Sequence, residues 1–163
     1  MAVLTFLQSL QETALGTWVR EGNYAFQAVA AVHVMSLMLS VGMMIWFDFR
    51  LIGVLASGRI SAVYRRLIPW ATVGFVLMLT SGAILFTGYA PEAYRNIYFR
   101  VKMATIVLAG VNALVYHLFT EQRVGRWEHG APPVTAARVA GAASLVLWAV
   151  VIICGRMMSY TIF

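Results

Sequence analysis

Residues 22–47 read GNYAFQAVAAVHVMSLMLSVGMMIWF and contain no Asp, Glu, Lys or Arg. At a rise of about 1.5 Å per residue, this stretch is long enough to cross a hydrocarbon core of about 30 Å as one helix. Three more uncharged stretches of about 17 to 24 residues follow it, at Leu67–Ala90, Met103–Thr120 and Val139–Gly155. None of them shows the period-two alternation of a transmembrane strand, so all four predict helices.

The composition favours a membrane fold. Of the 163 residues, 61% are hydrophobic and 11% are charged, whereas soluble domains carry about 25% charged residues. We therefore expect an all-α integral membrane protein, a four-transmembrane-helix bundle that forms a single membrane domain over residues 1–163. The expected spans lie at about residues 22–48, 66–90, 98–120 and 136–160. Connections this short leave no room for a soluble domain.

Residues 1–20 predict a short amphipathic helix that precedes the first span and lies in the membrane interface. Its apolar face carries Leu4, Leu7, Ala14, Leu15 and Trp18, and its polar face carries Gln8, Gln11 and Glu12. The segment has no basic start and its centre is polar, so it does not read as a signal peptide. A disordered N-terminus is the alternative.

The net charge of +6 raises the question of nucleic acid. The basic residues lie at the ends of the apolar stretches, which favours membrane lipids as partners and argues against nucleic acid. Because cytoplasmic loops carry the excess of Lys and Arg, we expect the first and third connections in the cytoplasm and both termini in the periplasm. The first and third connections hold Arg50, Arg59, Arg65, Arg66, Arg123, Arg126 and Arg138; the opposite side holds Arg20, Arg95, Arg100, Lys102 and Arg156.

Two histidines are the only residues inside the four spans that ionise near neutral pH: His33 in the first and His117 in the third. A neutral imidazole binds haem iron, copper or zinc, or relays protons. Small residues lie near both rings on their helix faces, such as Ala30 and Ser36 near His33. They leave room for haem, or they let the helices approach closely with each histidine hydrogen-bonded across the bundle. The spacing leaves both alternatives open.

The depth of the two histidines decides whether one iron can bind both. Counted from the outer ends of the spans, His33 and His117 lie within roughly 5 Å of a common level. Counted from the inner ends, they lie roughly 16 Å apart. A single haem with two histidine ligands is therefore allowed but not required.

Three basic residues, Arg100, Lys102 and Arg156, gather near the expected outer face. They are candidates to pair with haem propionates or an acidic substrate, and snorkelling to the interface is the other interpretation. Arg156 follows a long run of apolar or small residues, so we expect it to be drawn slightly into the membrane and to need an anionic partner.

Metal sites other than haem have weaker support. The first span carries Met35, Met38, Met43 and Met44, which suit copper(I) but also fill gaps in apolar interiors, so copper ranks below haem. Cys154 is the only cysteine and is expected to be a small buried hydrophobic residue.

The sequence shows no motif of soluble enzymes, and every acidic residue falls in a loop or, like Asp48, at the boundary of a span. A proton-driven transporter usually keeps a buried carboxylate, so this distribution argues against that class.

The segments AVHVMSL, DFRLIGV, RRLIPW, FRVKMATIVLAGVNALVYH and GAASLVLWAVVIICGR resemble those of a family of uncharacterised bacterial four-helix membrane proteins. The resemblance covers about residues 5 to 160. Its most specific positions map onto His33, Arg100, Lys102, Asn112, His117, Gly155 and Arg156. Members often carry an acidic residue two positions before the first histidine, where this chain has Ala31.

The chain is also similar, more loosely, to HemJ-type protoporphyrinogen oxidases and to CopD-like membrane proteins of copper resistance. In the HemJ type, a histidine of the first helix and a Lys…Tyr-His arrangement in the third accompany haem b. The matching residues here are His33, Lys102, Tyr116 and His117, although the spacing from Lys102 to His117 is longer.

These observations lead to one main expectation: a b-type haem-binding protein of the bacterial inner membrane that transfers electrons, alone or in a larger redox complex. His33 and His117 would bind the haem iron, and Arg100, Lys102 and Arg156 would bind propionates or substrate. If the chain is an enzyme, it is a membrane oxidoreductase. A homo-oligomer is expected because a short bundle leaves much lipid-facing surface. The alternatives are a cofactor-free accessory subunit and a copper-handling or small-solute permease.

Overall fold

The computed structural model describes residues 2–55, 60–120 and 135–162, and in these ranges the chain is helical without a strand. Four helices are long: α3 (Ala25–Leu51), α4 (Ile60–Gly88), α6 (Ile97–Val115) and α8 (Thr135–Ile162). Three shorter helices, α1 (Ala2–Gln11), α2 (Ala14–Glu21) and α5 (Ala90–Arg95), lie at one end of the bundle, and the π-helix η1 (Tyr116–Thr120) continues α6. The all-α fold expected from the sequence is confirmed.

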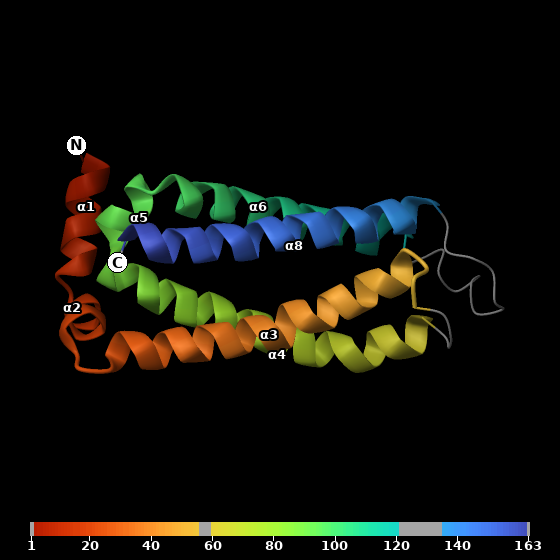
Figure 1. Ribbon diagram of the computed structural model, residues 1–163, viewed down its shortest axis with the longest axis horizontal. Coiled ribbons are helices and arrows are strands. Elements are labelled where there is room, and N and C mark those ends of the chain that lie inside the picture. Colours follow the sequence, from red (N-terminus) through yellow and green to blue (C-terminus); the bar gives the residue numbers. More distant parts are fainter. Residues whose placement is uncertain (1, 56–59, 121–134, 163) are drawn as a thin grey trace.

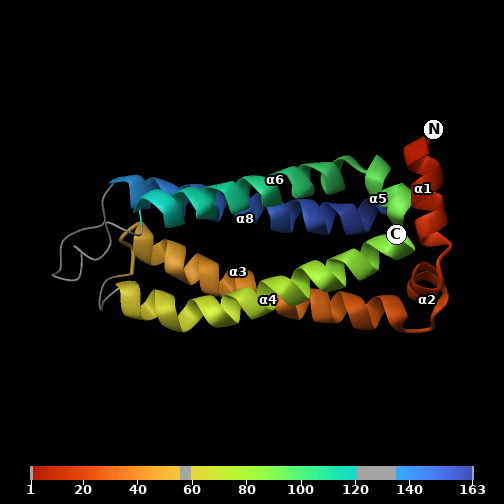
Figure 2. The ribbon, with the colours of Figure 1, turned by 180° about the vertical axis from the view of Figure 1, so that it is seen from behind.

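The long helices form two pairs. α4 packs mainly on α3, and α8 packs mainly on α6 (Figures 1 and 2). The pairs meet chiefly where α3 contacts α8, around an apolar core of Val41, Ala109, Trp148 and Val151. Both chain ends lie at the end of the bundle that carries α1 and α5 (Figure 1). We call this the α1 end, and the opposite end, where α3 stops at Leu51, the Leu51 end.

Four described helical segments are long and apolar enough to cross a membrane: Ala25–Leu51, Arg66–Gly88, Ile97–Leu118 and Thr135–Ile162. They overlap the four expected spans, with ends that differ by a few residues, and suggest a multi-pass membrane protein. At most 28% of the residues in the apolar window of any of them are buried. Most of their surface therefore faces outward. Three arginines used for the expected orientation, Arg59, Arg123 and Arg126, lie outside the described residues.

The inward face of each long helix follows a spacing of three or four residues, as expected for helices packed nearly side by side. These inward residues are Leu37, Val41, Met44, Asp48 and Leu51 on α3; Ala71, Gly74, Met78 and Ser81 on α4; Lys102, Thr105, Ala109, Asn112 and Tyr116 on α6 and η1; and Ala137, Gly141, Ser144, Trp148 and Val151 on α8.

Small residues allow α3 and α4 to approach closely. A Cβ atom on Gly74 would lie 2.8 Å from the backbone nitrogen of Ser40 and 3.1 Å from the backbone oxygen of Ser36. Ser36 and Ser40 are buried, and their hydroxyl groups donate to backbone carbonyls of their own helix. The two backbones are therefore in contact near the middle of the bundle, as in other small-residue helix interfaces.

The N-terminal segment differs from the single helix expected over residues 1–20. It forms two helices because Thr13 has an extended backbone and its hydroxyl caps α2 by accepting a hydrogen bond from the Gly16 nitrogen at 3.2 Å. Val19, fully buried, packs against Gly88 of α4, whereas Trp18 is 51% exposed. The break at Thr13 thus turns a different face of the second half toward the bundle.

Candidate functional site

His33 lies inside the α3–α4 pair, toward the α1 end. Its Nδ1 atom is 3.1 Å from the Ser81 hydroxyl, and a Cβ on Gly82 would lie 3.0 Å from the Cε1 atom of the ring. Because Gly82 has no side chain, the flat imidazole ring of His33 packs directly against α4. At His33 the structure therefore has the arrangement of the close-packing alternative: a histidine hydrogen-bonded across the bundle between small residues.

The hydrogen bonds of Ser81 fix which ring nitrogen carries the proton. The Ser81 hydroxyl has one hydrogen, and it is directed at the backbone carbonyls of Leu77 at 2.6 Å and Met78 at 3.1 Å. The oxygen of Ser81 is then left to accept from Nδ1–H of His33, and the Met78 carbonyl also lies near this ring. In the neutral imidazole, Nε2 consequently carries a lone pair.

Lys102, on the α6–α8 pair, lies at nearly the same position along the bundle axis as His33. His33 is eight residues from the start of α3, and Lys102 is five residues from the start of α6, so the two lie within about 5 Å along the bundle axis. The charge of Lys102 is close enough to act on the His33 ring. The Lys102 side chain is half-buried, with Nζ 5.6 Å from the centre of the Phe99 ring and Cδ close to Gly155 of α8.

His117 lies elsewhere. It belongs to η1, is exposed, and follows the buried Tyr116, which occupies the inward position of that turn. His117 is twenty residues from the start of α6, which places it about 18 Å farther along the axis than His33. The structure therefore does not bring the two histidines to one iron within a single chain, and the larger of the two separations expected from the sequence is the one observed.

The other two predicted basic residues face outward at the α1 end. Arg100 is exposed. Arg156 is exposed as well, and its guanidinium group contacts Tyr160, with a hydrogen bond of 2.7 Å and a distance of 4.5 Å to the ring centre. The predicted displacement of Arg156 into the membrane and its anionic partner stay predictions; in the structure its described partner is Tyr160. Lys102 is thus the member of the predicted basic group that enters the bundle.

The methionines of α3 do not converge. Met35 and Met38 are 69% and 68% exposed, whereas Met43 and Met44 are half-buried. Among the described residues, no three His, Cys, Asp or Glu side chains come together as metal ligands. Cys154 is buried with a free thiol, as expected.

The sequence interpretation missed Asp48. The sequence pattern predicts Asp48 at the boundary of the first span, but in the structure it is 5% exposed. Ser144 hydrogen-bonds its carboxyl group, and its Oδ2 atom is fully buried without a hydrogen-bond partner among the described residues. Because a carboxylate is present in the bundle interior, the expected lack of one no longer argues against ion or proton handling.

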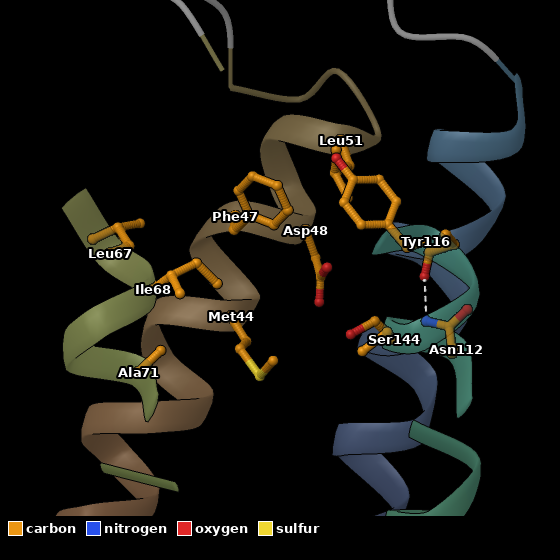
Figure 3. Close-up of a pocket in the computed structure, with 12 residues that line it drawn as sticks. Met44, Phe47, Asp48, Leu51, Leu67, Ile68, Ala71, Asn112, Tyr116 and Ser144 are labelled. Atoms are coloured by element: carbon orange, nitrogen blue, oxygen red, sulfur yellow. Dashed lines mark hydrogen bonds between the residues drawn. The ribbon is translucent and has the colours of Figure 1, made fainter. Parts of the chain in front are cut away.

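Asp48 points into a cavity of about 100 Å³ at the Leu51 end (Figure 3). All four long helices contribute to the wall. The lining consists mostly of apolar and aromatic residues, with Asn112 and Ser144 as the other polar groups. The amide nitrogen of Asn112 donates to the Ala140 carbonyl at 3.0 Å. The described lining residues are Met44, Phe47, Asp48, Leu51, Leu67, Ile68, Ala71, Asn112, Ala113, Tyr116, Ala140 and Ser144.

A signal for Asp48 was present in the sequence. It lies four residues after Met44 and three before Leu51, in phase with the inward face of α3. The same spacing on α6 links Lys102, Asn112 and Tyr116, and leaves His117 one position off that face. The candidate site thus consists of two separate regions: the His33–Lys102 layer toward the α1 end and the Asp48 cavity at the Leu51 end. Comparison of the chain with protein-family models, curated proteins and solved structures finds no match.

Proposed function

We propose that the chain is a multi-pass protein of the bacterial inner membrane that binds a b-type haem through Nε2 of His33 and takes part in electron transfer. One observation carries the proposal. The Ser81 hydroxyl holds Nδ1–H of His33 and leaves the lone pair on Nε2, which is how proteins usually orient a histidine that binds a metal.

The His33–Lys102 layer provides some of the contacts that a bound haem needs. His33 offers a neutral nitrogen ligand, and Ser81 fixes the orientation of the ring. Lys102, half-buried at the same level, supplies a positive charge for a propionate. His117 is not included, because it lies about 18 Å farther along the axis. A bound haem would supply reversible one-electron chemistry at its iron, with a potential tuned by the ligand and by the surrounding charge.

The outward-facing surface of the four long helices is available for contacts with other membrane components. With at most 28% of any apolar window buried, the candidate spans leave most of their area for lipids, for further copies of the chain or for a larger redox complex. We place both termini on the periplasmic side, as the balance of Lys and Arg favours. Both chain ends lie at one end of the bundle, as this topology requires.

The test is a reduced-minus-oxidised absorption spectrum of the detergent-purified protein, expressed with added haem precursor. We expect b-type bands in the wild type, and we expect His33→Ala to lose them. His117→Ala is the matched control: it removes the same side chain from an exposed position and should keep the bands. A colourless wild type, or equal loss in both variants, would overturn the proposal.

A cofactor-free accessory subunit is the second candidate. The observation that favours it is that His33 already has a partner in Ser81 and packs against Gly82, so no ligand is needed to satisfy its Nδ1–H. A colourless protein that co-purifies with a membrane complex and loses that association when its exposed apolar face is altered would support this candidate.

A further inference from the structure

Asp48 is a buried carboxylate without a charge partner. In the part of the chain that the structure describes, it forms no ion pair. Ser144 hydrogen-bonds the carboxyl group, but the Oδ2 atom has no hydrogen bond. Arg50, two residues later, is also buried, but its guanidinium group lies 5.3 Å from the centre of the Trp46 ring. Burial of an unpaired charge is costly, so the cavity beside Asp48 calls for a positive occupant.

The packing of α3 against α8 keeps Asp48 in this position. A Cβ on Gly141 would lie 3.0 Å from Cβ of Leu51 and 3.1 Å from the backbone oxygen of Asp48. α8 therefore touches the backbone of the turn that carries the carboxylate. The glycine permits this contact, and the side chain of Asp48 points toward the space near Ser144 and Asn112 (Figure 3).

The walls of the cavity indicate the kind of cation. Phe47 and Tyr116 pack edge to face with ring centres 6.0 Å apart, and in Figure 3 their rings lie to one side of the carboxyl group, with Met44 and Ser144 to the other. Aromatic faces and apolar walls attract the alkyl groups and the positive charge of an organic ammonium ion. The carboxylate and Ser144 would accept its N–H groups.

An inorganic ion fits this chemistry less well. Mg²⁺ and Ca²⁺ take six or more oxygen ligands, whereas few of the described lining residues bring a side-chain oxygen. The amide nitrogen of Asn112 is engaged by Ala140. The size also sets a limit, because a dry cavity of about 150 Å³ holds benzene, so about 100 Å³ suits an ion of about four non-hydrogen atoms.

The geometry points to a binding site for a small alkylammonium ion in the Asp48 cavity, with the ammonium group on the carboxylate and the alkyl group against Phe47, Tyr116 and Met44. This site is separate from the His33–Lys102 layer. Asp48 lies fifteen residues after His33 on α3, or about 22 Å along the axis. The inference therefore does not depend on the proposed haem.

The test is isothermal titration calorimetry on the purified full chain in detergent, with methylammonium, ethylammonium, tetrabutylammonium and potassium chlorides as probes. We expect ethylammonium to bind the wild type and tetrabutylammonium not to bind. Asp48→Asn keeps the shape and removes the charge, and we expect it to weaken binding about ten- to hundredfold, the effect of one hydrogen bond to a charged group.

The matched control is Glu12→Gln, which removes one negative charge from an exposed position at the α1 end and should leave ethylammonium binding unchanged. The absorption spectrum of each variant is recorded as well, so that loss of the haem and loss of the ammonium site are scored separately. If Asp48→Asn does not fold, the size series on the wild type still decides.

Three results would overturn the inference. The first is a folded wild type that binds none of the ammonium ions, which would mean that the carboxyl group is kept as the neutral acid. The second is equal binding by Asp48→Asn. The third is potassium displacing ethylammonium at lower concentration, which would identify an inorganic cation site.

Discussion

His33 and Asp48 lie on the same helix and both face the interior, but the bundle treats them differently. Toward the α1 end, the Nδ1 atom of His33 has Ser81 at 3.1 Å, and Gly82 packs against the ring. At the Leu51 end, Oδ2 of Asp48 has no hydrogen-bond partner within residues 2–55, 60–120 and 135–162, and a cavity lies beside it. The chain thus supplies a partner for Nδ1 of His33, whereas Asp48 receives a hydrogen bond from Ser144 but has no partner for Oδ2 among the described residues.

The contrast separates a polar atom that already has a partner in the chain, Nδ1 of His33, from one that has none, Oδ2 of Asp48. Removing the partner of a satisfied buried group should destabilise the fold, whereas neutralising an unsatisfied buried charge should stabilise it. Substitutions at the two regions are therefore expected to have opposite signs. The following predictions use this contrast, beginning with a change that disrupts both regions.

Gly74→Leu is expected to have the largest effect. Gly74 is the point at which the backbones of α4 and α3 touch, between the two regions, and a side chain there would force the helices apart. We expect a loss of about 3 kcal/mol of stability, measured by thermal unfolding followed by circular dichroism. Gly42→Leu is the control, because Gly42 is exposed with no atom within 4 Å of an added Cβ. Equal effects of the two substitutions would contradict this account of the interface.

Asp48→Asn is expected to stabilise the protein in a buffer free of amines. It removes a buried charge that pairs with no cation among the described residues, and the gain should be about 1 to 2 kcal/mol. With ethylammonium present in excess, the wild type should regain the advantage, because a ligand that binds only the folded state stabilises it. Destabilisation by Asp48→Asn in both buffers would show that the hydrogen bond with Ser144 already offsets the cost of burying the charge.

Ser81→Ala is expected to destabilise by about 1 kcal/mol, because it removes the acceptor of Nδ1–H of His33. The freed imidazole should also change the redox potential of the proposed haem, measured by spectroscopic titration. Thr80→Ala is the control: among the described residues its hydroxyl donates to the Val76 carbonyl of its own helix, and Thr80 is exposed. No difference between the two variants would mean that Ser81 does not orient the ring.

Asn96→Ala is expected to have the smallest effect and to act on the α1 end alone. Asn96 caps α6 by accepting hydrogen bonds from the backbone nitrogens of Tyr98 and Phe99, and loss of such a cap costs about 1 kcal/mol or less. Lys102 would then be held less firmly. Calorimetry with ethylammonium should give unchanged binding, and a change would show that the two regions are coupled.

The all-α fold could be predicted from the sequence because the lengths of the uncharged stretches largely determine where the long helices lie. An uncharged stretch such as residues 22–47 can cross a membrane only as a helix or as a strand of a closed barrel. The four long helices lie where such stretches predict them. The inward position of Lys102 was not foreseen, although its spacing from Thr105 and Ala109 contains the signal.

The pairing of polar groups was harder to predict. Whether His33 contacts α4, α6 or α8 depends on which helices are neighbours in the bundle. The amino-acid sequence of one chain does not specify the neighbours of each helix. Asp48 was assigned to a boundary because charges usually mark the ends of spans. Its burial follows from the contact of Gly141 with the last turns of α3, a relation between residues more than ninety positions apart.

Inward residues on α3 recur every three or four positions. This spacing also fixes the direction of the His33 side chain around the helix axis relative to that of Asp48. Each residue of a helix turns by about 100°, so inserting a single residue between His33 and Asp48 would swing one of them out of the bundle while the other stayed inside. An insertion of seven residues would preserve both directions but lengthen α3 by about 10 Å. Variation in length between these two positions is therefore restricted both by the direction of the side chains and by the length of α3.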